Sequence, residues 1–164
     1  LKEICDCLGR EVTTEIPEEE FYAAIPKLRE TCGDRAVMRA MHEYNENRRV
    51  PEQVACLEKG DFQGFLSLIR ESGFSSWMYL QNVIPAGYVR QQPVAVALGL
   101  CEHYLRGKGA YRVHGGGFAG VIMAMIPNDL VDEYTEYIEN AIGEGNVYRM
   151  SIRPHGAICV SERI

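Results

Sequence analysis

The spacing of hydrophobic residues changes near residue 108, and this change constrains the fold more than any other feature of the sequence. Before it, segments such as PVAVALGLCEHYL repeat apolar residues every three or four positions, which is typical of one face of an α-helix. After it, GVIMAMIP is an apolar run too short for a helix and ended by Pro127, which indicates a buried strand. We therefore expect an α+β fold, with a helical part over about 1–107 and a sheet-containing part over about 108–164.

Caps and prolines divide the helical part. Asp34 and Asp61 are expected N-caps, since a carboxylate can accept hydrogen bonds from the first free amides of a helix. Pro51 is expected to kink the long helix that follows Asp34 or to begin a second one, and Pro93 suits the first turn of another helix. The stretch SGFSSWMYLQNVIPAG, residues 72–87, has weak periodicity and is predicted as a loop.

The sheet-containing part holds four candidate strands. Residues 110–127 are predicted to form two strands joined by the glycine-rich stretch HGGGFAG. A helix capped by Asn128 or Asp129 is expected next. Residues 146–160 alternate apolar and polar side chains in VYRMSI and turn at Pro154, which predicts a second hairpin. Together these segments predict a mainly antiparallel sheet of about four strands with helices packed on it.

Composition and charge limit the classes of function. The chain has 46% hydrophobic and 24% charged residues, ordinary values for a globular protein. Its formal net charge of −6 argues against nucleic-acid binding, because affinity for phosphate backbones comes mostly from Lys and Arg. Any anionic ligand must then be held by local dipoles. No apolar run reaches the ~20 residues of a membrane span and no signal peptide is visible, so we expect a cytoplasmic protein without membrane contact.

Six cysteines are present, and none belongs to a C-x-x-C pair or lies near a paired histidine spacing. Scattered thiols of this kind are typical of a reducing compartment. We therefore predict no metal site. The six are Cys5, Cys7, Cys32, Cys56, Cys101 and Cys159.

The chain contains the pattern G-x-G-x-x-G at Gly115, Gly117 and Gly120, and several kinds of phosphate-binding loop share this pattern. A dinucleotide-binding fold requires a helix after the loop, whereas a strand is predicted here. A protein-kinase loop requires a later strand lysine and the H-R-D and D-F-G motifs, which do not follow. A P-loop requires Lys after the last glycine, where Val121 stands. Two interpretations remain: a nest of backbone amides for an anion, or a tight structural turn.

The wider stretch GAYRVHGGGFAGVIMAMIP resembles the third motif of galactokinases, members of the GHMP superfamily of small-molecule kinases. The usual form runs Gly-x-x-x-Arg-Met-Thr-Gly-Gly-Gly-Phe-Gly-Gly before an apolar strand. Val113, His114 and Ala119 depart from it, at the positions of Met, Thr and the fifth glycine of the loop. The matching residues are Arg112, Gly115, Gly116, Gly117, Phe118 and Gly120.

Other stretches are similar to further galactokinase motifs, so the resemblance covers nearly the whole chain. The family forms are Arg-Ala-x-His, Glu-Asn-x-Arg, Leu-x-x-Gly-Asp and Glu-Ser-His-x-Ser, and the tail resembles the family's final hairpin. Gly73 stands in place of the His of the fourth form. The matching residues are Arg39, Ala40 and His42; Glu46, Asn47 and Arg49; Leu57, Gly60 and Asp61; and Glu71, Ser72 and Ser75.

The resemblance implies that residues 1–164 form the C-terminal domain of a GHMP kinase, with a ferredoxin-like arrangement of sheet and helices, and that the N-terminal kinase domain is absent. The whole enzyme would transfer the γ-phosphoryl group of ATP, with Mg²⁺, to the anomeric hydroxyl of galactose or a related sugar. This chain would supply no catalytic residue and no metal ligand, and would be inactive alone. Its nucleotide-binding residues would be Gly115, Gly116, Gly117, Phe118, Ala119 and Gly120.

The same resemblance implies partners and leaves alternatives open. The expected partners are the missing N-terminal domain and the sugar, and the uncovered interdomain surface predicts self-association. His114 is interpreted either as a titrating group or as a locally hydrogen-bonded strand end. Ser75 and Ser76 are interpreted either as nucleotide contacts or as turn caps. The alternative function is a non-catalytic α+β binding or regulatory module derived from the kinase fold.

Overall fold

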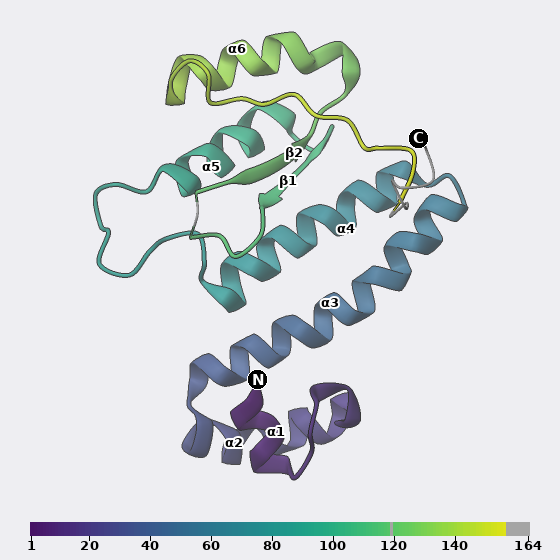
Figure 1. The fold of residues 1–164 in the computed structure, drawn as a ribbon, viewed down its shortest axis with the longest axis vertical. Helices are drawn as coiled ribbons and strands as arrows, with labels where there is room; N and C mark the ends of the chain where they lie inside the picture. Colours follow the sequence, from purple (N-terminus) through teal and green to yellow (C-terminus); the bar gives the residue numbers. More distant parts are fainter. Residues whose placement is uncertain (119, 157–164) are drawn as a thin grey trace, which may run out of the picture.

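The computed structural model describes residues 1–118 and 120–156. Helices dominate it and one small antiparallel sheet is present, so the fold is α+β as expected. In Figure 1, α1 and α2 lie at one end, α3 and α4 run through the middle, and the sheet lies with α5 and α6 at the other end. The elements are α1 (Lys2–Leu8), η1 (Thr13–Glu15), α2 (Glu18–Cys32), α3 (Asp34–Glu58), α4 (Phe62–Ser75), η2 (Ser76–Leu80), α5 (Pro93–Leu105), β1 (Ala110–Val113), β2 (Ile122–Met125), η3 (Asn128–Leu130) and α6 (Val131–Ile142).

The first three helices enclose a core of their own. Phe21 and Leu28 of α2 pack with Val37 and Ala40 of α3, and Ile4 of α1 completes the cluster. Each of these side chains is at most 3% exposed. Burial of apolar surface, at roughly 25 cal/mol per Å², therefore holds this helical end of the molecule together.

α3 runs unbroken from Asp34 to Glu58, so the alternative of a second helix beginning at Pro51 is wrong. A proline inside a helix removes one amide donor, but α3 packs against both α2 and α4, and these contacts maintain the helix. The expected cap at Asp34 is wrong as well, because Gly33 takes the N-cap position with a φ of 79° and Asp34 is the first helical residue. The Asp34 carboxylate instead accepts a hydrogen bond from Arg29 Nε at 2.5 Å.

α4 begins as expected, since the Asp61 side chain accepts a hydrogen bond from the Gly64 amide at 2.9 Å. The loop expected over 72–87 is wrong in its first half. There α4 continues to Ser75 and passes directly into the π-helical turn η2, which ends at Leu80 and is followed by Gln81 with a φ of 53°. The serines of this stretch are buried and hydrogen-bonded inside the protein, so their polarity does not mark a solvent-exposed loop.

The sheet consists of β1 and β2, paired antiparallel with Val113 opposite Ile122. This arrangement confirms the strand–loop–strand prediction for residues 110–127. One face of the sheet packs against Leu66 and Ile69 of α4, and the other packs against α5 and α6. Figure 1 shows the hairpin lying between these helical layers.

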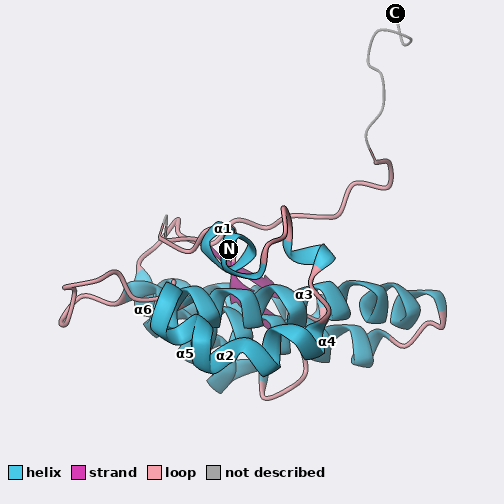
Figure 2. Cartoon of the chain, turned by 90° about the horizontal axis from the view of Figure 1, so that it is seen from below, coloured by secondary structure: helices cyan, strands magenta, loops and turns pink. Residues whose placement is uncertain are grey.

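The expected four-stranded, ferredoxin-like sheet is wrong for the part of the chain that the structure describes, which contains two strands. Residues 146–156 form no strand, and Tyr148, Met150 and Ile152 are 82%, 91% and 87% exposed. Figure 1 shows the chain turning back alongside α6, and Figure 2 shows its last described residues leaving the helices. Among the described residues, none covers these apolar side chains, and an uncovered strand buries too little apolar surface to be stable. The remainder of the expected hairpin, residues 157–160, lies outside the described residues.

The helices around the sheet begin in two different ways. α5 begins at Pro93, as expected. α6 begins at Val131, and neither Asn128 nor Asp129 caps it, because these two residues form the 3-10 turn η3 and Leu130 takes the N-cap position. None of the helices in the two described ranges combines the length and the apolar composition that crossing a membrane requires.

Candidate functional site

The glycine loop, residues 114–121, is a closed turn between β1 and β2. The exposed His114 donates its amide hydrogen to the carbonyl of the last loop residue at 2.9 Å. Gly115, Gly117 and Gly120 have φ values of 61°, 88° and 83°, a region that side chains make costly. The loop is followed by a strand and not by a helix, which again excludes a dinucleotide-binding fold.

One side of the glycine loop is open. At Gly115, Gly116 and Gly120, no atom lies within 4 Å of the position that a Cβ would occupy. Within the described residues, the amides from Gly115 to Phe118 donate to no acceptor, and the Phe118 side chain is exposed. Neighbouring amides without partners are suited to an anion. Ala119, the remaining residue of the expected nucleotide site, lies outside the described residues.

The other side of the glycine loop packs against Asn82. A Cβ at Gly117 would lie 2.3 Å from the Asn82 carbonyl oxygen, so only glycine fits there. The Asn82 side chain donates from Nδ2 to the Gly116 carbonyl at 3.3 Å and accepts from the Ser76 hydroxyl at 3.1 Å. The two sequence interpretations thus describe different glycines. Gly117 meets a packing requirement, whereas the open glycines leave room for an anion.

A polar cluster lies beside the loop, where β1 meets α3 and α4. Arg112 of β1 donates from Nη1 to the Ser72 hydroxyl at 2.5 Å, and Ser72 donates to Glu46 Oε2 at 2.6 Å. Glu46 also pairs with Arg49 and lies 3.8 Å from the Arg112 guanidinium. Ser72 is fully buried and Arg49 is nearly so. Because buried charges are costly unless they are paired, this cluster fixes how β1 sits on the two helices.

His42 extends the polar cluster to the end of α4. Its Nδ1 lies 2.9 Å from the Ser75 hydroxyl oxygen. Burial lowers the pKa of His42, the Glu46 carboxylate acts in the opposite direction, and two nearby arginines lower the pKa further. Ser75 and Ser76 are both buried and have partners inside the protein, so their contacts support a structural role.

The cluster unites residues from separate stretches of the sequence, all of which belong to the galactokinase-like motifs. Asn82 was missed at the sequence level, because it lies in a stretch without a motif and only the fold brings it to the loop. Its contact with the loop joins the polar cluster, through Ser75 and Ser76, to the open glycines. The motif residues in the cluster are His42, Glu46, Arg49, Ser72, Ser75 and Arg112.

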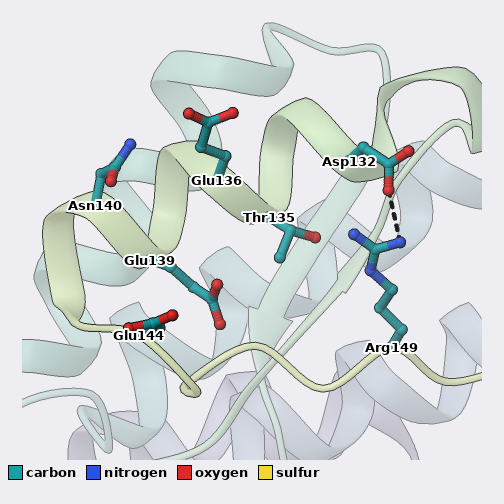
Figure 3. A pocket seen from close by; sticks show the side chains of 7 residues that line it. All are labelled: Asp132, Thr135, Glu136, Glu139, Asn140, Glu144 and Arg149. Carbon is teal, nitrogen blue, oxygen red and sulfur yellow. Dashed lines mark ion pairs between the residues drawn. The ribbon is translucent and has the colours of Figure 1, made fainter.

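A shallow hollow on α6 lies apart from this site. Figure 3 shows Asp132, Glu136 and Glu139 along its wall, with Arg149 paired to Asp132 at 2.6 Å. Glu144 adds another carboxylate. The excess of negative charge disfavours a phosphate group, so we do not assign the hollow to a nucleotide.

Large apolar side chains are exposed at the junction of α4 and η2. Phe74, Trp77 and Met78 are 53%, 38% and 62% exposed. They are neighbours in sequence to the buried serines that hold Asn82 and His42. An apolar surface of this kind is typical of a contact with another domain or protein.

Neither a metal-binding group nor a family match adds residues to the candidate site. In the part of the chain that the structure describes, no group of three or more His, Cys, Asp or Glu side chains is arranged to hold a metal ion. No protein-family model matches the chain. The candidate site therefore consists of the glycine loop, Asn82 and the polar cluster beside them.

Proposed function

We propose that this chain is the C-terminal part of an ATP-dependent sugar kinase of the galactokinase type, and that its glycine loop contacts the phosphates of ATP. The observation that carries the proposal is the polar cluster. Glu46, Ser72 and Arg112 match separate galactokinase motifs, and they form one hydrogen-bonded group beside the loop. Motifs that are distant in sequence but gather at one loop favour a shared function.

The open glycines would form the phosphate contact. Gly115, Gly116 and Gly120 leave space for oxygens to approach the backbone, and the amides from Gly115 to Phe118 have no acceptor among the described residues. In a chain with a net charge of −6, backbone dipoles offer a local means of holding an anion. Asn82 and Arg112 would maintain the shape of the loop and would not touch the nucleotide.

The remaining chemistry would come from the nucleotide and from the N-terminal kinase domain. Bound ATP supplies the γ-phosphoryl group, with Mg²⁺ offsetting the phosphate charge, and galactose or a related sugar accepts it. Positioning and charge stabilisation account for most phosphoryl-transfer catalysis, so this chain would shape one wall of the cleft. The exposed Phe74, Trp77 and Met78 would then face the N-terminal domain.

Gly116→Ala tests this role in the protein that joins the chain to its proposed N-terminal domain. The φ of Gly116 is not positive and its Cβ position is open, so alanine fits the fold. A methyl group would stand where a phosphate oxygen should approach. We expect galactose-dependent turnover to fall about 100-fold, the scale lost when a charge-stabilising contact is removed. A coupled ADP-release assay measures turnover, and the melting temperature should be unchanged.

Gly99→Ala is the matched control, because it adds the same methyl group in open space on α5. This variant should keep normal turnover. Near-normal turnover in a folded Gly116→Ala variant would contradict the proposed phosphate contact. Binding of ATP without turnover in the unmodified protein would favour the non-catalytic module, for which the departures at His114 and Ala119 are the argument.

A further inference from the structure

Two half-buried thiols meet where α1 contacts the end of α2. Cys7 lies in the last turn of α1, and Cys32 is the last residue of α2. Both pack against the apolar core of the N-terminal helices. The Cys32 Sγ lies 3.4 Å from the carbonyl oxygen of Glu3, which is one helical turn before Cys7 on the same face of α1.

The geometry of α1 brings the Cys7 side chain toward this sulfur. In an α-helix, the carbonyl of residue i accepts from the amide of residue i+4, so the Glu3 carbonyl oxygen is about 2.9 Å from the Cys7 nitrogen. The Cys32 sulfur is therefore within about 6 Å of the Cys7 backbone nitrogen. Helical side chains lean toward the N-terminus and cover the preceding turn, which is the turn that Cys32 contacts. The Cys7 side chain is therefore directed toward the Cys32 sulfur.

The thiols also influence each other. Burial raises the pKa of the Cys32 thiol, and the neighbouring Cys7 thiol raises the pKa further. The other described cysteines have different surroundings. Cys5 is buried, and the buried Cys101 thiol lies 3.0 Å from the Tyr134 hydroxyl oxygen. Cys56 lies on α3, outside the N-terminal core.

We propose that Cys7 and Cys32 are a redox pair that forms an intramolecular disulfide when the protein meets a hydroperoxide. One thiolate attacks a peroxide oxygen of H₂O₂, becomes a sulfenic acid and releases water. The second thiol then attacks that sulfur, a second water leaves, and the S–S bond forms. Two thiols are oxidised, and one peroxide is reduced to two waters. A cellular dithiol reverses the reaction, so the disulfide is a reversible link between α1 and the end of α2.

The test is peptide mapping of the 164-residue chain after treatment with hydrogen peroxide and alkylation of the remaining thiols. Trypsin without reductant should release residues 3–10 joined to residues 30–35. Because the first peptide also contains Cys5, the map is repeated in Cys5→Ala, which should keep the link, and in Cys7→Ser, which should lose it. Oxidation should also raise the melting temperature by about 5 °C or more in the unmodified chain and leave Cys7→Ser unchanged.

Cys56→Ser is the matched control, since it removes a half-buried thiol far from the pair, and it should keep both the link and the temperature shift. Three results would overturn the proposal. They are a link from Cys32 to Cys5, a link found only between two copies of the chain, and stable sulfenic acid on Cys7 and Cys32 without a link. Circular dichroism of each variant before oxidation verifies that the helices are intact, so loss of the link reports on the thiols themselves.

Discussion

The β1–β2 hairpin and residues 147–152 are both short stretches with the apolar content of strands, and they have opposite fates. Tyr111 and Val113 of β1 are 6% and 1% exposed, whereas Tyr148 is 82% exposed. α4 covers one face of the hairpin and α5 the other, while the apolar side chains of Tyr148, Met150 and Ile152 in the second stretch stay exposed. The comparison shows that an alternating pattern of apolar residues identifies the side chains that can be buried. A strand forms only where another element of the fold covers those side chains.

Glycines make the covering of the hairpin possible. A Cβ at Gly73 of α4 would lie 3.0 Å from the Tyr111 carbonyl oxygen, and a Cβ at Gly109 would lie 2.3 Å from the Met125 carbonyl oxygen. Without side chains at these positions, α4 and β2 approach the β1 backbone closely. The close approach brings Leu66 and Ile69 of α4 into contact with the sheet.

The largest expected contrast between the two stretches comes from a pair of tyrosines. Tyr111→Ala should lower the free energy of unfolding by about 3–5 kcal/mol, because it removes a buried ring and leaves a cavity in the core that the sheet forms with α5 and α6. Tyr148→Ala should change it by less than about 0.5 kcal/mol, since the ring is exposed. Urea unfolding of both variants measures the contrast. Equal destabilisation would show that residues 147–152 are packed in solution.

A pair of arginines gives the next contrast. Arg112→Met should cost about 2 kcal/mol, because Ser72 and Glu46 lose a charged partner in a largely buried place. Arg149→Met should cost less than about 0.5 kcal/mol, since its ion pair with Asp132 is exposed to solvent. The same urea titration measures both. A loss at Arg149 that matches the loss at Arg112 would contradict the contrast.

The smallest expected effect is a pH dependence at His42. Its pKa is lowered below the ordinary 6.5 in the folded protein, so the unfolded chain binds the proton more tightly. Its contribution to stability is therefore full above pH 6.5 and is lost as the pH falls from there through the folded pKa. His42→Gln should reduce the difference in melting temperature between pH 7.5 and pH 5.5, values chosen to bracket about 6.5.

The exposed His155, three residues after the second stretch, provides the control for that measurement. His155→Gln should leave the pH dependence of the melting temperature as it is in the unmodified chain. An unchanged pH dependence in His42→Gln would show that the contacts with Ser75 and the charged groups around His42 do not favour the neutral ring.

Much of the fold could be predicted from local signals in the sequence. Apolar stripes, the Asp61 cap and Pro93 locate helices, because these effects act within one or two turns. Pro51 begins no second helix, because tertiary packing of α3 outweighs one lost hydrogen bond. Residues 147–152 misled the prediction because alternation alone does not reveal whether a helix is available to cover the strand.

The candidate site also has parts that the local sequence predicts and parts that only the fold reveals. The position of the glycine loop could be predicted from its glycine-rich sequence and from the short apolar segments before and after it. Its contact with Asn82, 34 residues earlier in the chain, follows from no local pattern. The burial of Ser72, Ser75 and Ser76 was equally hidden, because serine is common in exposed turns and only their partners on other elements account for it.

The placement of the single tryptophan has a practical consequence. Trp77 stands in the π-helical turn beside Ser76, whose hydroxyl bonds the Asn82 side chain that in turn holds the glycine loop. Its indole is partly exposed, so its emission responds to the polarity around it. The molecule thus carries an intrinsic fluorophore connected to the loop through two hydrogen bonds, so the proposed ligand binding at the loop can be tested by fluorescence without a label.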